Sequence, residues 1–502
     1  MEKQLEVSLN FDEDIAQYLA RKYPNKEYQI LSKSLDARKA PLGRSPKYLY
    51  KILLDSQRKF DFTVNPQQLD SVPIIIGFGP AGMFAALRFM DYGIKSLVFE
   101  RGEDVQNRMK SIAKYWRYGT LNSESNVCYG EGGAGLFSDG KIYTRIKSDF
   151  IHYVLEKFVE AGADEKILYE SNPHLGSHKI RKIIKKLTGK LQSFGSEIKF
   201  NTAVESLIMD NGKAIGVKLH TGESIYSNHI ILAAGHSAYE MYKTLHTQGV
   251  QMSKKDFALG VRIEHPRKYM DKIQFGEFAG KLGAATYRVT HHDHSIDIGT
   301  YSFCMCPGGY VLSSTTDDGT LVTNGMSNDS HNSPWSNAAI VVAVKSDSLP
   351  GEVFSGFDYI QEIEKKAFNA SAELASGKEM PAITLKEFLE DKLTSADLPK
   401  SSVPSKLVKV DFRKIFPENI IKQLKISLLE FDKKIKGFNL DEAILIAPET
   451  RTSSPIKIDR DKKKLVSSST IGLYPCGEGA GYAGGITSAA VDGIKVVDSI
   501  LS

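Results

Sequence analysis

Residues 72–102 read VPIIIGFGPAGMFAALRFMDYGIKSLVFERG, and this stretch decides the fold of the chain. It begins with an apolar run, turns at a cluster of glycines, continues as an apolar segment of helical length and closes with a second apolar run. The order predicts a buried strand, a tight turn, a helix and a second buried strand, which together form a βαβ unit. Because such units build parallel sheets, we expect an α/β fold.

The glycine cluster matches the pattern G-x-G-x-x-G directly after a strand and at the start of a helix, which is the context that gives the pattern meaning. The first glycine permits the tight turn, the second lets the backbone approach a diphosphate, and the third lets the helix pack closely on the strand. The positive end of the helix dipole then attracts phosphate. The residues predicted to bind a dinucleotide here are Gly77, Gly79, Pro80, Ala81 and Gly82.

An acidic residue, Glu100, closes the second strand eighteen residues after Gly82. A carboxylate at this position accepts hydrogen bonds from the ribose hydroxyls of an adenosine and repels a 2′-phosphate. The site is therefore expected to prefer FAD or NAD over NADP. The neighbouring Arg101 is expected to contact the same cofactor.

A second glycine-rich segment lies near the other end of the chain, where residues 475–490 read PCGEGAGYAGGITSAA. An NAD dehydrogenase usually completes its cofactor site soon after the first half, so this distant segment favours FAD. We expect Glu478 near the ribityl chain or the pyrophosphate, and the helix start near the N1–C2=O edge of the flavin. The residues expected to bind FAD here are Gly477, Glu478, Gly484, Gly485 and Ile486.

Two further glycine turns fall between these ends, in YGEGGAGLFSDGKIY at 129–143 and HIILAAGHSA at 229–238. Glycines in such loops let backbone N–H groups face a phosphate or the flavin ring. We expect Lys141 or Glu131 to lie within reach of the flavin, and both are candidates for catalysis. The cofactor-binding residues expected in these turns are Gly132, Gly133, Gly135, Ala234 and Gly235.

The chain of 502 residues is too long for a single core, and its pattern divides into four segments. The segments are a small α/β cap at 1–70, the first part of the FAD-binding domain at 71–250, a substrate domain at 251–440 and the C-terminal part of the FAD-binding domain at 441–502. In the cap we expect strands at 5–9, 28–32 and 48–54 and a helix at 12–22. The predicted fold is a Rossmann-like FAD-binding domain with an inserted mixed β/α substrate domain and a small N-terminal α/β domain.

The composition argues against several classes of protein. A net charge of +5 over 502 residues is too dilute to indicate nucleic-acid binding. The charged N-terminus does not resemble a signal peptide, and the longest apolar stretches are far shorter than the roughly 20 residues of a membrane span. Four widely spaced cysteines, at 128, 304, 306 and 476, indicate a reducing cytoplasm rather than a disulfide scaffold.

Candidates for the chemistry lie in the middle of the chain. Arg262 and His265, in the segment GVRIEHP, are candidates for substrate binding or proton transfer, and a structural ion pair on a strand is the alternative. Cys304 and Cys306 point to one face if YSFCMC is a strand. Either that face contacts the flavin or the substrate, or the two cysteines are simply small hydrophobic side chains buried in the core. Cys304 is therefore a further catalytic candidate.

Several familiar sites are missing from the sequence. The chain lacks a second G-x-G-x-x-G and the redox-active C-x4-C or C-x2-C of glutathione-reductase-like enzymes, so a dithiol relay of that kind is not expected. NADH or NADPH, as an electron donor, would dock without a Rossmann unit of its own. The best candidate for a metal is the tract at 291–294, HHDH, but a solvated polar loop is the preferred interpretation and no metal site is expected.

The motifs together resemble those of a known family. IIIGFGPAGMFAAL, FERG, GEGGAGLFSDGK, ILAAGHSA, GVRIEHP, YSFCMCPGG, VTNGMS and YPCGEGAGYAGGITSAAVDGIK resemble the bacterial FAD-dependent dehydrogenase group, often labelled NAD(FAD)-utilizing dehydrogenases, within the two-dinucleotide-binding-domain flavoproteins. The resemblance spans roughly residues 30–500. It implies non-covalent FAD, an FAD domain interrupted by a substrate domain and an N-terminal cap, and it supplies no substrate.

The resulting hypothesis is an FAD-dependent oxidoreductase, a dehydrogenase or reductase that transfers hydride through flavin N5 to or from a small organic substrate. A flavin monooxygenase is one alternative. A flavin-binding partner or RNA-associated protein, docking through the basic segment at 34–47, is another. The sequence leaves the substrate, the electron donor and acceptor and the oligomeric state open.

Overall fold

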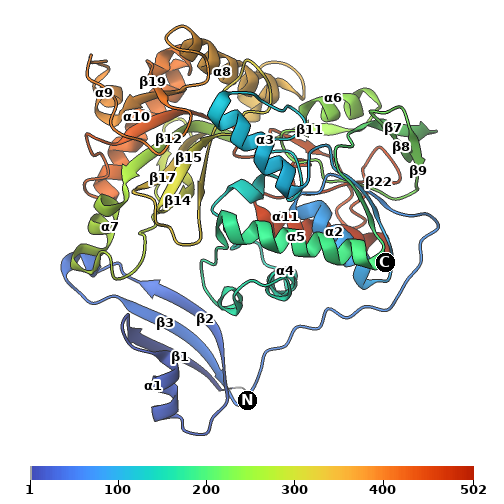
Figure 1. Cartoon of the computed structure of the whole chain (residues 1–502), viewed down its shortest axis with the longest axis horizontal. Helices are drawn as coiled ribbons and strands as arrows, with labels where there is room; N and C mark the ends of the chain where they lie inside the picture. The colour runs from blue at the N-terminus through green and yellow to red at the C-terminus, as the bar shows by residue number, and fades with distance from the viewer. Residues whose placement is uncertain (1–2) are drawn as a thin grey trace.

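The computed structural model describes residues 3–502, and its N-terminal unit is a three-stranded antiparallel sheet with one helix (Figure 1). The elements are β1 (Lys3–Asn10), α1 (Ile15–Lys22), β2 (Tyr28–Asp36) and β3 (Lys47–Leu54), and the sheet order is β1-β3-β2. Leu9, Leu19 and Ile52 are buried between sheet and helix. The predicted strands and helix are confirmed, but the helix begins at Ile15 because the Asp14 side chain accepts a hydrogen bond from the third residue of the helix.

A long segment without helix or strand, residues 55–73, connects this unit to the rest of the chain (Figure 1). Phe62 of this segment packs against the core of the parallel sheet region. A second contact lies on β2, where the backbone of Lys33 bonds to those of Tyr169 and Ser171 at 2.7 and 2.9 Å. The N-terminal unit is therefore attached to the larger part of the molecule at more than one place.

A fully parallel five-stranded sheet, in the order β22-β10-β4-β5-β6, carries the predicted glycine turns. Its strands are β4 (Ile74–Ile76), β5 (Leu97–Phe99), β6 (Glu197–Lys199), β10 (Ile230–Leu232) and β22 (Leu473–Pro475). Helix α2 (Pro80–Asp91) connects β4 to β5, which confirms the predicted βαβ unit. The two ends of the chain meet in this sheet, since β22 pairs with β10 and β10 pairs with β4.

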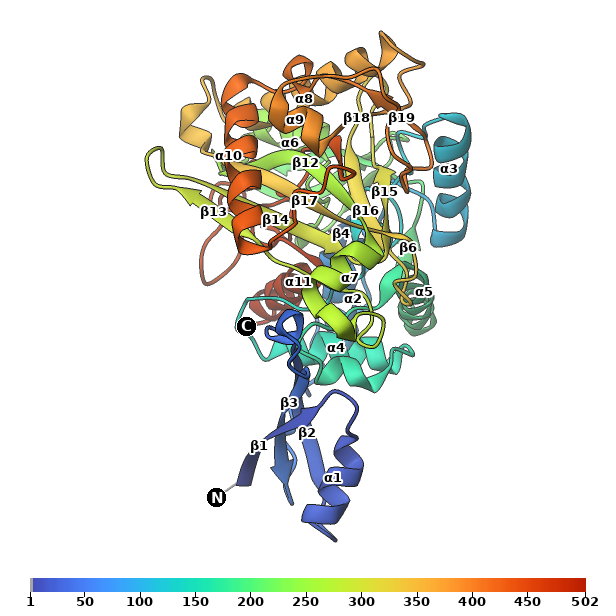
Figure 2. The same cartoon turned by 90° about the vertical axis from the view of Figure 1, so that its left-hand side faces the viewer.

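Helices gather on the parallel sheet, where α2 and α11 pack side by side (Figures 1 and 2). Besides α2, the helices in this region are α3 (Val105–Tyr118), α4 (Phe150–Glu160), α5 (Gly176–Phe194) and α11 (Ile486–Ile500). A Cβ at Gly493 of α11 would lie 2.2 Å from the carbonyl oxygen of Ala81, so the two helices approach through small residues. A separate antiparallel sheet and one helix complete the region, namely β7 (Val204–Asp210), β8 (Lys213–Leu219), β9 (Ser224–Tyr226) and α6 (Tyr239–Thr247).

A seven-stranded mixed sheet, β13-β14-β17-β12-β20-β18-β19, forms the second large layer. Its strands are β12 (Phe257–Pro266), β13 (Thr290–Asp293), β14 (Ile298–Cys306), β17 (Trp335–Val344), β18 (Met380–Thr384), β19 (Leu407–Lys409) and β20 (Ile444–Glu449). The associated helices are α7 (Arg267–Phe275), α8 (Ser355–Ala372), α9 (Leu385–Glu390) and α10 (Glu418–Lys434). Two small pairs accompany them, β15 (Gly309–Ser313) with β16 (Thr323–Ser327), and β11 (Met252–Lys254) with β21 (Ile456–Ile458).

The stretch 356–440, predicted to be mostly helical, contains three helices and also the strands β18 and β19. Both strands are short, and β18 is buried on both faces without an alternating pattern, so periodicity did not reveal it. The predicted fold class is otherwise confirmed: the protein is α/β, with a Rossmann-type parallel sheet and a separate mixed sheet. Among residues 3–502, no helix has both the length and the apolar character that a membrane span needs.

Candidate active site

A cavity of about 2500 Å³ is lined by the glycine turns of the parallel sheet and by β14, β16 and the end of β20 in the mixed sheet. Most of the predicted cofactor residues line it, namely Gly77, Gly79, Pro80, Ala81, Glu100, Arg101, Gly133, Gly135, Ala234, Gly235, Glu478, Gly484, Gly485 and Ile486. Ligand pockets commonly measure about 300–1,000 Å³, so this cavity has room for a dinucleotide and a substrate. Contact of these residues with FAD stays a prediction.

Gly82, Gly132 and Gly477 do not line the cavity, because they serve the packing of the turns. A Cβ at Gly82 would lie 2.1 Å from the carbonyl oxygen of Gly77, which is the close approach of helix and strand that the motif predicts. A Cβ at Gly132 would lie 2.9 Å from the Leu136 side chain, and one at Gly477 would lie 2.8 Å from the Cβ of Ala81. These three predicted binding residues are therefore corrected to supporting residues.

The fingerprint turn has the geometry of a phosphate cradle. Gly77 has a φ of +94°, and a Cβ there would lie 2.4 Å from the carbonyl oxygen of Ala233. Gly79 caps α2, which begins at Pro80, and a Cβ at Gly79 would meet only Gly133 at 3.8 Å. The turn thus leaves an open space above the N-terminus of α2, where free N–H groups and the helix dipole favour an anion.

The carboxylate of Glu100 links three loops at the edge of the cavity. It accepts hydrogen bonds from the backbone N–H groups of Phe78, Gly102 and Gly130, at 2.8, 2.9 and 2.9 Å. Since an ionised carboxylate offers about four lone-pair sites, one remains for a ribose hydroxyl. Glu100 therefore holds the fingerprint turn against the second glycine loop, a function that the sequence did not reveal.

Glu131 does not line the cavity and is buried, so the structure gives no support to its candidacy for catalysis. Its buried carboxylate accepts a 2.8 Å hydrogen bond from the backbone of Val105, at the start of α3, and another from the Thr188 hydroxyl. The buried guanidinium of Arg108 donates to the carbonyls of the same loop, including that of Glu131 at 2.7 Å. Glu131 thus fixes the shape of the loop by linking it to the start of α3 and to α5.

Lys141 lies on the cavity wall, as predicted, within a charged cluster. Its ammonium lies 2.6 Å from the Asp139 carboxylate and also donates to the carbonyl of Met305. Asp139 is buried and accepts a 2.9 Å hydrogen bond from Nε2 of His331, whose ring stacks on His174 at 4.2 Å. Burial alone would raise the pKa of Asp139, but Lys141 and His331 hold that pKa well below its usual range.

The same cluster keeps Lys141 charged. Burial opposes the ammonium, but the Asp139 carboxylate raises the pKa of Lys141 above its usual value. Burial and the nearby His331 lower the pKa of His174. The cavity wall therefore presents a fixed positive charge beside two imidazoles, which suits the stabilisation of negative charge and the movement of a proton.

Cys304 and Cys306 do not point to one face, because β14 is irregular here. The register between β14 and β17 shifts between Phe303 and Cys306, and Cys304 has a φ of +43°. Cys304 lines the cavity and is half-buried, whereas Cys306 is 0% exposed and lies behind it. The two thiols therefore differ in their access to the cavity.

Arg262 and His265 do not line the cavity, so their assignment to substrate contact is wrong. Arg262 is fully buried and makes a bidentate ion pair with Glu449, at 2.7 and 2.9 Å, which is the structural alternative considered for this strand. Nε2 of His265 donates to the carbonyl oxygen of Phe438 at 2.8 Å, and burial lowers the pKa of its imidazole to about 4. Both side chains support the mixed sheet.

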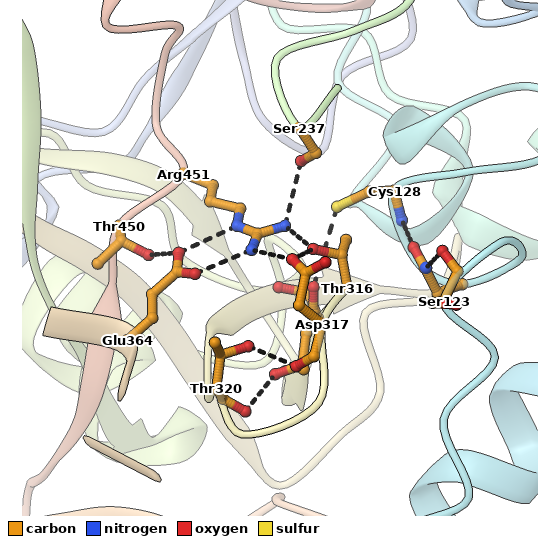
Figure 3. Close-up of polar contacts among 12 residues, drawn as sticks. Ser123, Cys128, Ser237, Thr316, Asp317, Thr320, Glu364, Thr450 and Arg451 are labelled. Atoms are coloured by element: carbon orange, nitrogen blue, oxygen red, sulfur yellow. Dashed lines mark hydrogen bonds and ion pairs between the residues drawn. The ribbon is translucent and has the colours of Figure 1, made fainter. Parts of the chain in front are cut away.

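A partly buried arginine that the sequence did not single out, Arg451, lines the cavity and joins the two large layers (Figure 3). Its guanidinium binds both oxygens of Glu364 of α8, at 3.0 and 2.9 Å. It also donates to the Thr316 hydroxyl at 2.6 Å and to the Ser237 hydroxyl, just after β10, at 3.2 Å. No local motif marks this contact, since its partners come from three distant segments.

Glu478 lies on the cavity wall beside His236 and Lys255, and its contact with the ribityl chain or the pyrophosphate stays a prediction. Its Oε1 is 3.8 Å from Nδ1 of His236, and its side chain is 27% exposed. Burial raises the pKa of Glu478 to about 7, an effect that Lys255 partly offsets. Nε2 of His236 is buried without a hydrogen-bond partner, so it offers a polar atom to a ligand of the cavity.

The histidine tract at 291–294 forms part of β13 and the following turn rather than a loop. His292 pairs with Asp297 at 3.1 Å on the surface, and the two residues lie in a hairpin of β13 and β14. Within residues 3–502, no three His, Cys, Asp or Glu side chains are placed to hold a metal ion.

Comparison with known proteins gives a family match and one close relative. Residues 256–452 match the family described as "FAD-dependent protein, C-terminal domain-like". A protein of Clostridium beijerinckii, described only as uncharacterized, is 40% identical over 442 residues, which cover 87% of this chain and 81% of the relative.

Solved structures show weaker likeness. The structure of CtdE in complex with FAD is 12% identical, covers 88% of this chain and 84% of that chain, and has a TM-score of 0.32. A geranylgeranyl bacteriochlorophyll reductase-like protein from Thermoplasma acidophilum is 14% identical, covers 85% of this chain and 77% of that chain, and has a TM-score of 0.34.

Proposed function

The chain belongs to the same family as the Clostridium beijerinckii relative, and its residues 256–452 match the family of FAD-dependent proteins; on that premise we propose that it is an FAD-dependent oxidoreductase acting on a small organic substrate. The observation that carries the proposal is that the residues predicted to bind FAD, from both ends of the chain, line the same cavity as a partly buried cluster of Asp139, Lys141, His174 and His331. Membership of the FAD-dependent dehydrogenase group is part of the proposal.

The residues present fit FAD. The open space at Gly79 would receive the diphosphate, and the free lone pair of Glu100 would accept from the adenosine ribose. At the start of α11, a Cβ added to Gly484 or Gly485 would meet no atom within 4 Å, which leaves room for the flavin. When bound, FAD would supply hydride transfer at N5, and the protein would supply orientation and electrostatics.

The chain's own residues have defined tasks in this proposal. The Lys141 ammonium, fixed by Asp139, would stabilise negative charge that develops on substrate or cofactor. His331 and His174, which also line the cavity, would hold or pass on a proton. The N-terminus of α11 would stabilise negative charge at the flavin N1–C2=O edge.

The electron donor in the proposal is NADH or NADPH, docked in the cavity itself. Within residues 3–502 the five-stranded sheet is the only fully parallel sheet, so a pyridine nucleotide has no second sheet of this kind to bind. The substrate domain would be 251–440 and the cap 1–70. All four cysteines are free thiols, which supports a cytoplasmic location.

The experiment is anaerobic stopped-flow mixing of the purified holoprotein with NADH and with NADPH, following the visible absorption of oxidised flavin. Rapid bleaching supports a reductase driven by pyridine nucleotide, and slow reoxidation by oxygen then separates it from a monooxygenase. If neither nucleotide bleaches the flavin, and a screen of small metabolites also finds no reductant, the proposed redox function fails.

A further inference from the structure

Cys304, which lines the cavity, and Cys306, which is buried behind it, are separated by one residue in a segment of unusual backbone conformation. Cys304 has a φ of +43°, a left-handed conformation that residues other than glycine rarely adopt, and β14 is out of register at this point. Gly308 permits the turn that follows, since its φ is +50° and a Cβ there would lie 1.9 Å from the carbonyl oxygen of His331. Such local strain concentrates at functional sites and motivates a functional hypothesis.

The irregular backbone brings the two sulfurs together. In a regular strand, residues two apart are separated by about 6.6 Å, near the upper limit for Cα atoms joined by a disulfide. Here the Cys306 thiol is turned back toward Cys304 and donates to the carbonyl oxygen of Cys304 at 3.3 Å. Both cysteines are free.

The surroundings make the two thiols unequal. Hydrogen bonding from Cys306, helped by the positive charges of Lys141 and Arg262, lowers the pKa of the Cys304 thiol. The same interaction, together with burial, raises the pKa of the Cys306 thiol. The Cys304 thiol, which lines the cavity, therefore ionises more readily than the Cys306 thiol, which does not line it, and this is the arrangement of an attacking and a resolving cysteine.

A second observation points to a ligand at this part of the wall. The hydroxyl of Tyr287 is buried without a hydrogen-bond partner, and the side chain, 5% exposed, lines the cavity. Burial raises the pKa of the Tyr287 hydroxyl, and Arg262, which donates to the carbonyl oxygen of Cys304 at 3.3 Å, partly offsets that rise. A buried hydroxyl without a partner costs free energy, so a polar ligand atom beside the thiols would satisfy it.

We propose that Cys304 and Cys306 form a redox-active dithiol whose reaction partner in the cavity is a low-molecular-weight disulfide. The Cys304 thiolate attacks one sulfur of the disulfide RSSR, forming a mixed disulfide and expelling RS⁻. Cys306 loses its proton and attacks the sulfur of Cys304, which releases the second RS⁻ and forms the Cys304–Cys306 disulfide. Two protein thiols are oxidised, one RSSR is reduced and two RSH result, so atoms and electrons balance.

This proposal rests on the proposed function for turnover only, because the flavin cofactor would supply the two electrons that return the protein disulfide to the dithiol. The exchange itself needs no flavin. It is therefore tested on the protein thiols, and flavin content is measured separately on the same samples, so that failure of one proposal is distinguished from failure of the other.

The experiment mixes the reduced full-length holoprotein with the chromogenic disulfide dithiobis(nitrobenzoate) and follows thionitrobenzoate release, with the products identified by peptide mass spectrometry. The variants are C304S, C306S and, as a matched control, C128S, which removes another half-buried thiol of the same cavity. Circular dichroism and bound FAD establish that each variant is folded, and C304A serves as a second variant at the attacking position.

The proposal predicts that the wild type and C128S release two equivalents from the pair and acquire a Cys304–Cys306 disulfide. C306S should release one equivalent and keep a mixed disulfide on Cys304, and C304S and C304A should lose the fast phase by at least about tenfold. The proposal is overturned if folded C304S reacts as fast as the wild type, or if the wild type forms only mixed disulfides.

Discussion

The backbone N–H of Phe78 donates a 2.8 Å hydrogen bond to the carboxylate of Glu100, so the strand end of β5 holds the fingerprint turn after β4. The same carboxylate also accepts from Gly102 and Gly130. One acidic side chain therefore sets the relative position of the two glycine loops that line the cavity. We therefore expect Glu100 to affect both the stability of the fold and the binding of the cofactor.

Glu100→Gln should weaken the fold as well as the binding of FAD. The amide nitrogen of glutamine cannot accept from a backbone N–H group, so at least one buried donor loses its partner, at a cost of about 1–3 kcal/mol. We expect the free energy of unfolding of the apoprotein, measured with urea, to fall by this amount. Glu160→Gln, which breaks an exposed 2.8 Å pair with Lys190, should change it by less than about 1 kcal/mol.

Gly79→Ala should weaken FAD binding without changing the stability of the apoprotein. A methyl group at this position meets only Gly133 at an ordinary distance and φ is −78°, so the apoprotein should keep its melting temperature. The methyl group occupies the space where the diphosphate approaches, so FAD affinity should fall at least about tenfold. Gly189→Ala in the interior of α5, with no neighbour within 4 Å, should leave FAD affinity unchanged and stabilise the apoprotein by about 0.5–1 kcal/mol. An unaltered FAD titration with Gly79→Ala would place the cofactor elsewhere.

Lys141→Met should slow reduction of the flavin by substrate or nucleotide by roughly 10- to 100-fold, because a preorganised positive charge is lost from the cavity wall. Lys141→Arg keeps the charge and should retain most of the rate. The exposed Lys147 provides a matched control, since Lys147→Met removes an ammonium outside the cavity. Equal anaerobic rates for Lys141→Met and Lys147→Met would remove Lys141 from the mechanism.

Glu478→Gln should reveal a pH dependence in the stability of the apoprotein. Burial raises the pKa of Glu478 to about 7 in the folded state, above the value of about 4.3 in an unfolded chain. A raised carboxyl pKa contributes stability below the unfolded value, and that stability is lost as pH rises through the folded pKa. The variant should therefore be more stable than the wild type by about 1–3 kcal/mol near pH 8, with the difference shrinking toward pH 4. A constant difference across this range would contradict the assignment.

Local sequence was sufficient for the parallel sheet and for most of the cavity lining. The turn at Gly77 requires a positive φ, which glycine adopts readily, and the fixed φ of Pro80 favours the start of a helix at that position. Both features follow from residues of the same short segment. The same holds for the small residues of α11. These features depend on the identity of one residue and its neighbours in the chain.

The features that could not be predicted from local sequence depend on contacts between distant segments. The direction of the Glu131 side chain is decided by the start of α3, and the ion pair of Arg451 depends on α8, so neither leaves a local pattern. The bulge at Cys304 was missed because nothing in YSFCMC requires a left-handed residue. Such conformations are imposed by the neighbouring strand and the turn beyond it.

The central claim is that the cavity of this chain holds FAD without a covalent bond. The most direct measurement is the flavin content of the purified chain, obtained by heat denaturation and chromatography of the released cofactor. We predict about one FAD per chain in the supernatant, released without proteolysis, and loss of this bound FAD in Gly79→Ala. A colourless protein that takes up no added FAD would contradict the account.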